Sequence, residues 1–430
     1  MERGRLYEPC CCTQEAAAGG MALIVQKFGG TSVGDVARIK NVAERVVATR
    51  RAGHDVVVCV SAMSGETNAL VALSEAINEG RPANPREYDV LVSTGEQKTI
   101  ALLSMAIDGL GESAQSFTGG QMGMRTDSAH TRARIERIEA EALRGALGRG
   151  QICVIAGFQG VDPDGHITTL GRGGSDTSAV AMACALGADA CEIYTDVDGV
   201  YTADPRVVPS AKRLDRITFE EMLELASVGA KVLQIRSVKF AMQHGLPLHV
   251  RSSFVEDEGT WVVPEEDVME RLIVSGVTCN DNEAKIHVRN VPDQPGIAAR
   301  LFTPLSDAGI IVDMIIQNLS RDGSTDVTFT VPRAEYAKAL NLAREAAQEM
   351  GCHNVGGDED IAKVSVVGLG MKDHAGVATR MFAVLAEEGI NIQMISTSEI
   401  KVSVAIEEKY AELAVRALHA AFVEGDAAQL

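Results

Sequence analysis

The sequence predicts a mainly parallel α/β domain followed by two copies of a smaller α+β unit. Up to about residue 253, continuous apolar runs alternate with helical stretches, and a repeated segment then fills most of the remaining chain. Apolar strands that alternate with helices are typical of a parallel sheet buried on both faces. The length of 430 residues agrees, because two to three domains are expected at about 100–200 residues each.

Composition and charge exclude several classes of protein. With 46% apolar residues the chain can build cores, so it is not globally disordered. It has no run of the roughly 18–20 apolar residues that cross a membrane, and its net charge of −19 argues against binding nucleic acid. Among the nine cysteines, only the triplet Cys10, Cys11 and Cys12 comes close to the paired short spacings of a zinc site. We therefore expect free thiols in a cytoplasmic protein that has neither a membrane nor a nucleic acid as its partner.

The α/β domain is expected to occupy residues 21–254. Its first strand, at 22–28, ends in two glycines, and a helical pattern continues to about Thr49. Further strand-like runs are found at 54–60, 89–94, 151–158 and 191–197. Ligands collect beyond the carboxyl ends of parallel strands, so the polar turns after these runs are the expected place for a site. Residues 1–20 precede this pattern and are expected to be a disordered leader.

An internal repeat follows an acidic stretch, 255–270, that we expect to be a linker. The copies start at Ala284 and Ala362, and each predicts the order strand, glycine loop, helix, strand, strand, helix. The two units are expected at 271–357 and 358–430. The second copy ends without an obvious last strand, and the spare strand at 272–279 is expected to complete it, so that the units interlace. Two matched copies favour ligand binding and regulation, with a purely structural role as the alternative.

Two glycine-rich segments of the α/β domain suit phosphate or carboxylate chemistry. Lys27 lies near the end of the first strand and two glycines follow that strand, where backbone N–H groups and a lysine can meet a phosphate, unless the glycines only form a turn. Residues 171–178 (GRGGSDTS) precede an Ala-rich helix and offer an arginine, an aspartate and three hydroxyls to an anion. The alternative is a loop in which Asp176 or Ser175 merely caps this helix.

A third segment, 194–206, is dense in acceptors. Its carboxylates, Asp196, Asp198 and Asp204, could hold Mg²⁺ through oxygen or water, or they could be ordinary turn residues. No Ser/His/Asp or Cys/His arrangement stands out in the sequence. A lysine, an arginine, glycine-rich anion loops and clustered carboxylates together indicate phosphoryl transfer, which depends on positioning and charge neutralisation.

These motifs resemble those of the aspartate kinases. They are KFGGTSV (27–33), VSAMSGETN (60–68), STGE (93–96), TLGRGGSDTSA (169–179), YTDVDGVYTADPR (194–206) and GAKVL (229–233). The repeat resembles the paired ACT domains of the feedback-regulated form, which implies an amino-acid kinase fold followed by two ferredoxin-like βαββαβ domains. The resemblance covers nearly all of residues 21–425. It leaves no room for the homoserine dehydrogenase domain of the bifunctional forms.

The resemblance also implies a reaction. The γ-phosphoryl group of MgATP would pass to the β-carboxylate of L-aspartate, giving 4-phospho-L-aspartate, in the first step of the branch to lysine, threonine and methionine. Lys27 would neutralise the transferring group, and Asp176 would organise this group and the attacking carboxylate. Arg172 would clamp the α-carboxylate of aspartate, and Glu96 would pair with its ammonium group. The implied aspartate site comprises Ser61, Thr67, Glu96, Arg172 and Ser175.

The cofactors implied are ATP and Mg²⁺, without a metal site made by the protein alone. The implied nucleotide site comprises Lys27, Phe28, Gly29, Gly30, Ser32, Thr195, Asp196, Tyr201, Asp204, Pro205, Arg206 and Lys231. Two competing functions stay open. One is another small-acid kinase on the same fold, and the other is an amino-acid sensor with an inactive kinase domain.

In the family, threonine and lysine bind between ACT units, which implies two matched sets of effector residues. The first set is Asp293, Gln294, Pro295, Gly296, Ile297, Ala298, Ile311, Val312, Asp313 and Gln317. The second set is Val377, Ala378, Asn391, Ile392, Ser398 and Glu399. The family's first unit commonly has Asn at the position of Ile311, so an amide that could hold an amino acid is missing here. The implied assembly is a homo-oligomer through the ACT domains, or an α2β2 complex whose β subunit starts at Met269.

Overall fold

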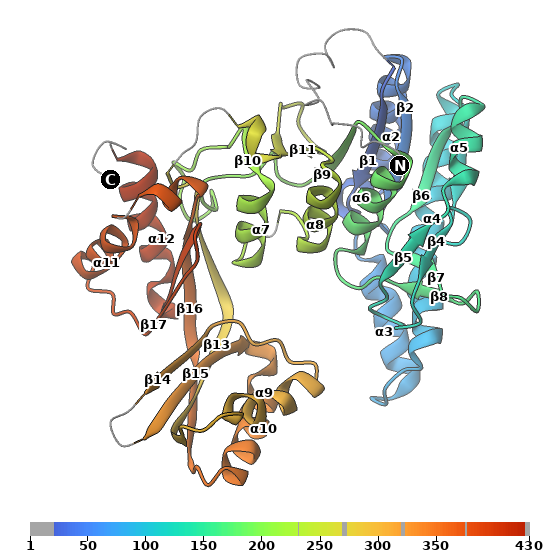
Figure 1. Cartoon of the computed structure of the whole chain (residues 1–430). Coiled ribbons are helices and arrows are strands. Elements are labelled where there is room, and N and C mark those ends of the chain that lie inside the picture. Colours follow the sequence, from blue (N-terminus) through green and yellow to red (C-terminus); the bar gives the residue numbers. More distant parts are fainter. Residues whose placement is uncertain (1–20, 231, 269–272, 320–322, 375, 426–430) are drawn as a thin grey trace, which may run out of the picture. The chain divides into compact units, whose positions relative to one another are not determined.

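The computed structural model describes residues 21–230, 232–268, 273–319, 323–374 and 376–425 (Figure 1). The expected leader and Met269 lie outside these residues. The chain forms two compact units, which are described separately. The N-terminal unit runs to Val200 and adds Leu214–Phe219 and Val232–Val268, and the C-terminal unit holds Tyr201–Arg213, Glu220–Lys231 and the chain from Met269.

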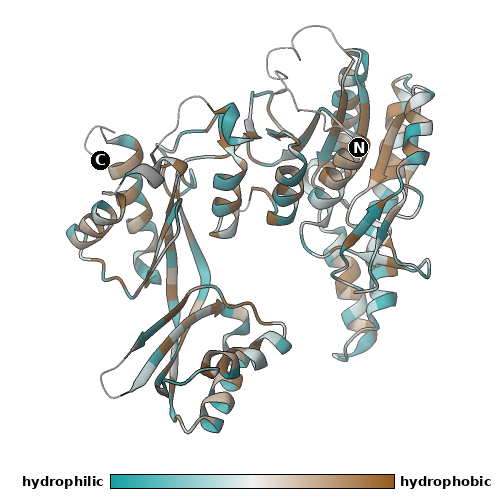
Figure 2. Cartoon of the chain, in the orientation of Figure 1, coloured by the Kyte–Doolittle hydropathy of each residue, from teal (hydrophilic) through white to brown (hydrophobic). Residues whose placement is uncertain are grey.

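The N-terminal unit is built on an eight-stranded sheet in the order β10-β12-β11-β9-β1-β2-β6-β3. Its strands are β1 (Leu23–Phe28), β2 (Asp55–Val60), β3 (Ala114–Phe117), β6 (Ile152–Ala156), β9 (Ala190–Thr195), β10 (Arg216–Thr218), β11 (Leu248–Ser252) and β12 (Thr260–Val263). All neighbours in this sheet are parallel except β11 and β12. The predicted fold class is confirmed. Apolar residues, brown in Figure 2, run along the central strands because both faces of the sheet are covered.

Helices cover the two faces of this sheet differently. They are α2 (Val36–Arg51), α3 (Glu66–Asn78), α4 (Pro85–Gly109), α5 (Glu141–Gly148), α6 (Gly174–Leu186) and α8 (Ile235–His244). Phe28 and its same-face neighbours pack against α2 and α4 in one apolar cluster. Side chains alternate along a strand, so Lys27 projects from the opposite face, where α6 contacts β1 and β9. A smaller four-stranded sheet adds β4 (Met124–Thr126), β5 (Ile135–Ile138), β7 (Gln159–Val161) and β8 (Ile167–Thr169).

Two expectations about the N-terminal unit are wrong. The strand expected at 89–94 is part of α4, whose start is fixed by Pro85 at its first turn and by the Asn84 side chain, which accepts from the Arg86 N–H at 3.0 Å. The expected linker at 255–270 contains β12, because its TWVV run pairs with β10 and β11. An apolar run alone does not separate a strand from the face of a long helix.

A buried charge network crosses the middle of the large sheet. Glu192 accepts hydrogen bonds from Gln26 Nε2 at 2.8 Å and Tyr194 OH at 3.0 Å, and Arg251 Nη1 lies 3.3 Å from its other oxygen. Burial alone raises the pKa of Glu192, but its interactions with His249, Gln26 and Arg251 outweigh burial and lower the pKa to about 2. The ionised form is therefore the one that the fold stabilises.

We expect Glu192→Gln to destabilise the protein by about 2–3 kcal/mol at pH 7. A carboxyl group whose pKa is lower in the folded state stabilises the fold above its ordinary pKa. That contribution is lost as the pH falls from about 5 towards 2. Urea unfolding across this range should show a smaller loss of stability with acid in the variant than in the wild type. Equal pH profiles would contradict the stabilising role of the ionised carboxylate.

The C-terminal unit contains one six-stranded antiparallel sheet in the order β14-β15-β13-β16-β18-β17. Its strands are β13 (Gly276–Pro292), β14 (Ile315–Leu319), β15 (Ser324–Pro332), β16 (Asn354–Val367), β17 (Met394–Thr397) and β18 (Lys401–Glu407). The helices are α7 (Phe219–Ser227, which joins this unit from Glu220 on), α9 (Ile297–Asp307), α10 (Tyr336–Glu349), α11 (Val377–Glu387) and α12 (Ala411–His419), which continues as a π-helix over Ala420–Glu424.

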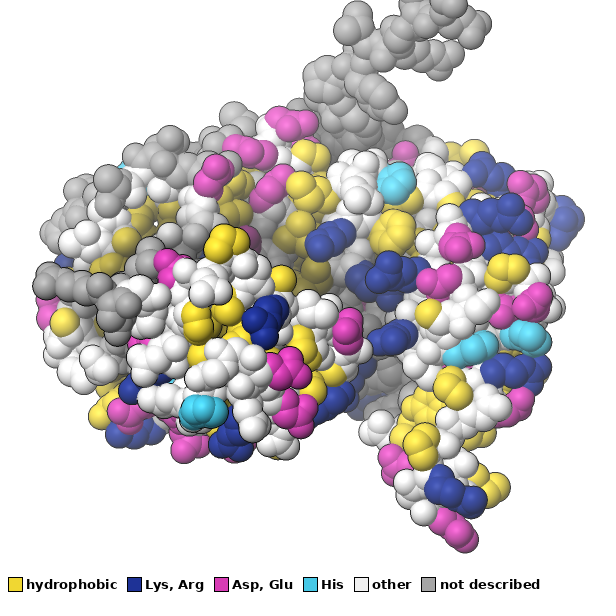
Figure 3. Space-filling view, turned by 60° about the horizontal axis from the view of Figure 1, so that its bottom comes forward, with side chains coloured by type: hydrophobic (Ala, Val, Ile, Leu, Met, Phe, Trp, Pro, Cys, Tyr) yellow, Lys and Arg dark blue, Asp and Glu magenta, His cyan; other side chains and the backbone are white. Residues whose placement is uncertain are grey.

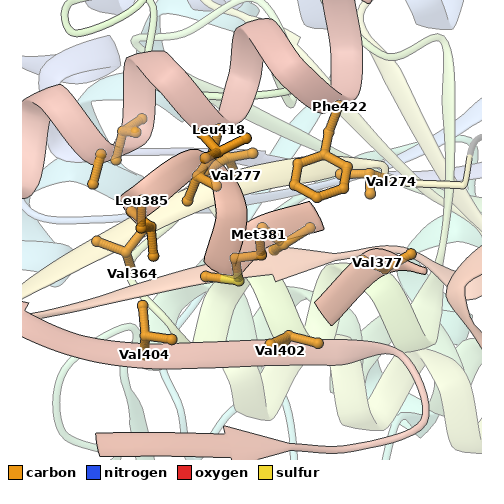
Figure 4. Packing of buried hydrophobic residues seen from close by; sticks show 14 of the residues in the cluster. Val274, Val277, Val364, Val377, Met381, Leu385, Val402, Val404, Leu418 and Phe422 are labelled. Carbon is orange, nitrogen blue, oxygen red and sulfur yellow. The ribbon is translucent and has the colours of Figure 1, made fainter. Parts of the chain in front are cut away.

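The two repeats share the long strands β13 and β16. Residues 276–280 of β13 pair with 363–367 of β16, whereas 285–289 pair with 354–358. The first part of β13 thus lies in the sheet of the second repeat. Its Val277 packs into the core of that repeat with Met381, Leu385 and Leu418 (Figure 4).

The C-terminal unit also includes two segments that the sequence placed in the α/β domain. Residues 201–213 contribute the buried Ala203 and Val208 to the core of the second repeat. In residues 220–231, Glu221 accepts hydrogen bonds from Ser275 Oγ at 2.5 Å and Leu369 N at 2.9 Å. The expected boundary at 254 therefore misses these excursions, because they are fixed by packing with residues far along the chain. None of the helices in the described parts of the chain has the length and apolar character needed to cross a membrane.

Candidate functional site

A buried ion pair marks the centre of the candidate site. Lys27 of β1 lies opposite Cys59 and Ile193 in the parallel register, and its Nζ is 2.5 Å from Oδ1 of Asp176 in α6. Both side chains are about nine-tenths buried. The two residues that were predicted to handle the transferring group are thus in direct contact.

Close backbone packing brings the start of α6 to this pair. Gly173 precedes the helix with a φ of +69°, and no side chain caps the first turn. The alternative in which Asp176 or Ser175 only caps the helix is therefore wrong. A Cβ on Gly157 would lie 2.8 Å from Ser175 Oγ, so only glycine lets Ser175 lie so close to the end of β6. This crowding fixes Ser175 and Asp176 on the Lys27 face of the sheet.

Glu96 is a buried carboxylate with an unused oxygen. It lies on α4, is 3% exposed, and its Oε1 accepts a hydrogen bond from the Ala62 N–H at 3.0 Å. Its Oε2 is buried without a hydrogen-bond partner among the described residues. Burial raises the pKa of Glu96 to about 7. A buried, unpaired carboxylate oxygen is costly, so a bound cation such as an ammonium group fits this position.

The remaining residues expected to bind aspartate are polar and partly open to solvent. Arg172 is exposed and has no hydrogen bond or ion pair with any described residue, which leaves its guanidinium available to a carboxylate. Ser61 lies directly after β2 and donates its N–H to Phe28 O at 3.2 Å. Thr67 is half-buried in the first turn of α3.

The expected nucleotide residues are divided between the two units. Phe28 was expected to contact ATP, but its ring is fully buried and stacks on Tyr194 at 4.5 Å, so only its backbone is available. Gly30 lies close to the chain after β2, because a Cβ there would be 2.9 Å from Ala62 O. Ser32 Oγ is hydrogen-bonded to Ser253 Oγ at 2.5 Å. In the N-terminal unit this set also includes Gly29, Thr195 and Asp196.

The other expected nucleotide residues are in the C-terminal unit or outside the described chain. Tyr201, Asp204, Pro205 and Arg206 belong to the C-terminal unit, and Lys231 lies outside the described residues. Arg206 Nη2 is 2.7 Å from Asp204 Oδ2, and the hydrogen bond from Arg206 is the main cause of a lowered Asp204 pKa.

The carboxylates of segment 194–206 are divided between the units, with Asp196 and Asp198 in the N-terminal unit and Asp204 in the C-terminal unit. Among the described residues, a set of three metal-binding side chains with close ligand atoms occurs at Asp162, Asp164 and His166, after β7. Oδ1 of Asp162 already accepts the N–H groups of Asp164 and His166, at 3.0 and 2.8 Å, which explains this cluster as a turn.

The loop 201–213 is held by the C-terminal end of the chain. Thr202 Oγ1 is hydrogen-bonded to Nε2 of the buried His419 at 2.8 Å, and Thr202 O accepts from the Val277 N–H at 2.8 Å. Ser210 Oγ donates to Glu424 Oε1 at 2.5 Å. Residues expected to bind ATP therefore share one packed body with the second repeat.

The two expected effector sets lie at opposite edges of the six-stranded sheet. Ile311, Val312, Asp313 and Gln317 precede or belong to the edge strand β14, and Asn391, Ile392, Ser398 and Glu399 flank the other edge strand, β17. Asp293, Gln294, Pro295, Gly296, Ile297 and Ala298 run into α9, and Val377 and Ala378 start α11. The starts of the two edge strands nevertheless approach each other, because Met314 and Met394 belong to one buried cluster with Ile361 and Ala405.

In each repeat, a lysine of the long first strand (β13 or β16) contacts the residue just before the second strand of the other repeat (β17 or β14). Lys363 Nζ contacts Asp313 Oδ2 and lies 3.4 Å from Glu283 Oε1. The equivalent Lys285 hydrogen-bonds to Gln393 Oε1, and Gln393 is the counterpart of Asp313 at the offset of 80. Asp313, expected to bind an effector, is thus already paired with a lysine of the same chain.

Sequence reasoning missed Asp89, which is fully buried in α4. Its carboxylate accepts hydrogen bonds from residues 130–131 and 169, which are 41, 42 and 80 positions away in the chain. The signal in the sequence is a charged residue at the start of the apolar run VLV (90–92).

Comparisons with known proteins agree with this geometry. Residues 22–252 match the amino acid kinase family, and 288–346 and 364–422 each match the ACT domain family. An aspartate kinase of Pseudomonas fluorescens is 61% identical over 403 residues, covering 94% of this chain and 98% of that protein. Crystal structures of E. coli aspartokinase III, one with aspartate and ADP and one with lysine and aspartate, give TM-scores of 0.79 and 0.72 at 28% identity. Each covers 93% of this chain and 99% of the other. With a kinase domain, a tandem ACT pair and this identity over nearly the whole chain, the protein belongs to the aspartate kinase family.

Proposed function

We propose that this enzyme transfers the γ-phosphoryl group of MgATP to the β-carboxylate of L-aspartate, giving 4-phospho-L-aspartate. The observation that carries the proposal is the buried Oε2 of Glu96, which has no partner among the described residues and would be satisfied by a substrate ammonium group. The E. coli relative binds aspartate and ADP in its crystal structure, which supports the same substrates here.

The chain's own residues can perform this reaction by positioning and charge neutralisation. The Glu96 carboxylate would hold the ammonium group of aspartate, and the free Arg172 guanidinium would hold its α-carboxylate. Lys27 would stabilise negative charge on the transferring group, with Asp176 fixing the position of its Nζ. The attacking β-carboxylate is already ionised near pH 7, so no strong general base is needed.

The residues near Lys27 fit a nucleotide phosphate. The backbone of Gly29 lies beside the lysine and leaves room for a ligand there, since a Cβ on Gly29 would lie 3.5 Å from Lys27 Nζ. We propose that Mg²⁺ binds together with ATP, as the family resemblance implies. When bound, Mg²⁺ neutralises phosphate charge during transfer.

A substrate panel tests the proposal against another small-acid kinase and against an inactive sensor. The wild-type chain is incubated with MgATP and L-aspartate, L-glutamate or N-acetyl-L-glutamate, and ADP release is measured by a coupled assay. We expect turnover with aspartate and only background ADP release with the other two acids. Preference for another acid, or no turnover with any of them, would overturn the proposal.

We also propose feedback regulation through the C-terminal unit by lysine, threonine or both, in the branch that leads to lysine, threonine and methionine. The E. coli relative binds lysine in one of its structures. The two sets flank the two edge strands of the sheet, β14 and β17, and we propose that a second ACT pair beside the first completes the effector sites. This favours a homo-oligomer, or an α2β2 complex with a β subunit from Met269.

Exposed isoleucines at both edges support such an assembly. Ile311 and Ile315 near β14 are 74% and 53% exposed, and Ile395 of β17 is 43% exposed. In Figure 3 the bottom of the Figure 1 view comes forward, and hydrophobic side chains (yellow) are visible at the surface of the C-terminal unit. Light scattering with and without lysine and threonine measures the assembly, and kinase assays with each effector alone and with both identify the inhibitor. A monomer under all conditions would contradict this assembly.

The packing of loop 201–213 predicts how regulation reaches ATP. We expect Thr202→Val to raise the KM for MgATP about fivefold or more and to weaken effector inhibition, with the KM for aspartate unchanged. The variant leaves His419 Nε2 and the Lys212 N–H without the hydroxyl that they now contact at 2.8 and 3.0 Å. Thr303→Val, at an exposed position of α9, is the matched control. An unchanged KM for MgATP in Thr202→Val would rule this coupling out.

A further inference from the structure

We propose that Asp89 is a positioning residue that keeps the two halves of the aspartate site at a fixed separation. The inference rests on the proposed function, because it concerns Glu96 and the loop that carries Arg172. Asp89 is 0% exposed and lies near the start of α4, the helix that also carries Glu96. We assign it no contact with substrate, and its effect is exerted through the residues that it holds.

The Asp89 carboxylate is surrounded by donors. Oδ1 accepts from Thr131 N at 3.1 Å and from Thr169 Oγ1 at 2.6 Å, and Oδ2 accepts from Thr169 N at 3.1 Å. His130 Nδ1 lies 2.9 Å from Oδ2, where a proton on this nitrogen makes it a further donor. Only a group that accepts with both oxygens satisfies this arrangement, which a carboxylate can do and an amide cannot.

One of these donors has a strained backbone. Thr131 has a φ of +69°, in the left-handed region that a β-branched residue rarely adopts. Its N–H also lies 3.0 Å from Asp89 Oδ2, so both carboxylate oxygens hold this residue in place. Strain of this kind persists only where the surroundings enforce it, and it is concentrated at functional sites.

The strained loop is packed against the segment that leads into Arg172. The Ala133 N–H donates to Thr169 O at 2.8 Å, and Thr131 O is so close to Gly171 that a Cβ there would lie 3.3 Å away. From α8, Arg236 donates to Leu170 O at 2.8 Å. Residues 169–171 are therefore held from two sides, immediately before the exposed Arg172.

The same helix face fixes the other half of the site. Asp89, Ser93 and Glu96 are spaced i, i+4 and i+7 along α4, so they share one face, and all three are buried. Ser93 O accepts from Gln159 Nε2 at 3.0 Å, which ties this face to β7. The ammonium and α-carboxylate of aspartate are attached to one carbon atom, so Glu96 and Arg172 must keep a fixed separation. Asp89 maintains this separation because it links α4, which carries Glu96, to residues 169–171, which immediately precede Arg172.

Asp89→Asn tests this assignment in the full-length enzyme. The amide has nearly the same size, but its NH₂ group would face the N–H and O–H donors around it. We expect the KM for aspartate to rise about tenfold or more, since small displacements of binding groups are costly, while the KM for MgATP changes less than about twofold. Asp108→Asn is the matched control, because Asp108 is an exposed α4 aspartate that accepts from the Ala114 N–H at 3.1 Å.

If Asp89→Asn does not fold, a second pair of variants tests whether Asp89 positions the aspartate site. Thr169→Ala removes the 2.6 Å bond and keeps the carboxylate, and Thr169→Ser restores the hydroxyl. We expect a raised KM for aspartate in Thr169→Ala and rescue in Thr169→Ser. An unchanged KM for aspartate in Asp89→Asn and Thr169→Ala, or an equal rise in both KM values, would overturn this inference. If the wild type itself does not phosphorylate aspartate, the proposed function fails instead.

Discussion

Lys27→Met and Asp176→Asn are each expected to lower kcat by at least about 10²–10³-fold, because each removes a charge that we propose acts on the transferring group. The 2.5 Å ion pair between them is nearly buried. Each single variant therefore also leaves one buried charge without its partner, at a cost of about 3 kcal/mol in stability. Steady-state kinetics and urea unfolding measure the two effects separately.

The double variant Lys27→Met/Asp176→Asn separates catalysis from folding. With both charges removed, no unpaired buried charge is left, so we expect stability to return towards that of the wild type while activity stays absent. Lys239→Met, at an exposed position of α8, is the control for loss of a lysine. A folded double variant with substantial turnover would disprove the roles assigned to this pair.

The KM for aspartate is expected to rise about tenfold between pH 8 and pH 6. Burial raises the pKa of Glu96 to about 7, so this carboxyl group is mostly neutral at pH 6 and mostly ionised at pH 8. Only the ionised form pairs with a substrate ammonium group. Aspartate binding lowers the pKa of Glu96 again, so protons should be released on binding near pH 7, which calorimetry in buffers of different ionisation enthalpy can detect.

Glu96→Gln should remove this pH dependence. An amide cannot ionise, so the KM for aspartate is expected to be raised about tenfold or more at pH 8 and to vary little with pH. Glu87→Gln is the matched control, since Glu87 lies on the same helix with a side chain that is 61% exposed. A pH profile in Glu96→Gln equal to that of the wild type would show that Glu96 is not the titrating group.

The sequence predicts most of the fold because its signals are local. Buried parallel strands such as β2 and β6 are continuous apolar runs, and the glycine loops after β1 and before α6 are visible directly. The run at 89–94 misleads, since its apolar residues belong to one side of a 25-residue helix. There the Asn84-Pro85 start was the better signal.

The parts that could not be predicted depend on distant partners. Phe28 directly follows Lys27, but strand alternation sends its ring into the opposite core. Asp89 takes its role from donors 41 to 80 residues away, and loop 201–213 belongs to the C-terminal unit through Thr202 and His419, which are 217 positions apart. Residue types and spacing identify which side chains can react. They do not identify the distant residues that hold those side chains in position.

The most direct test of the central claim identifies the atom that receives the phosphoryl group. Wild-type enzyme is incubated with MgATP, L-aspartate and hydroxylamine, and the trapped product is identified by NMR. If Arg172 and Glu96 hold the α-carboxylate and the ammonium group as proposed, only the β-carboxylate is free to attack. We therefore predict aspartate β-hydroxamate. Formation of the α-hydroxamate, or no hydroxamate while ADP is released, would contradict this account.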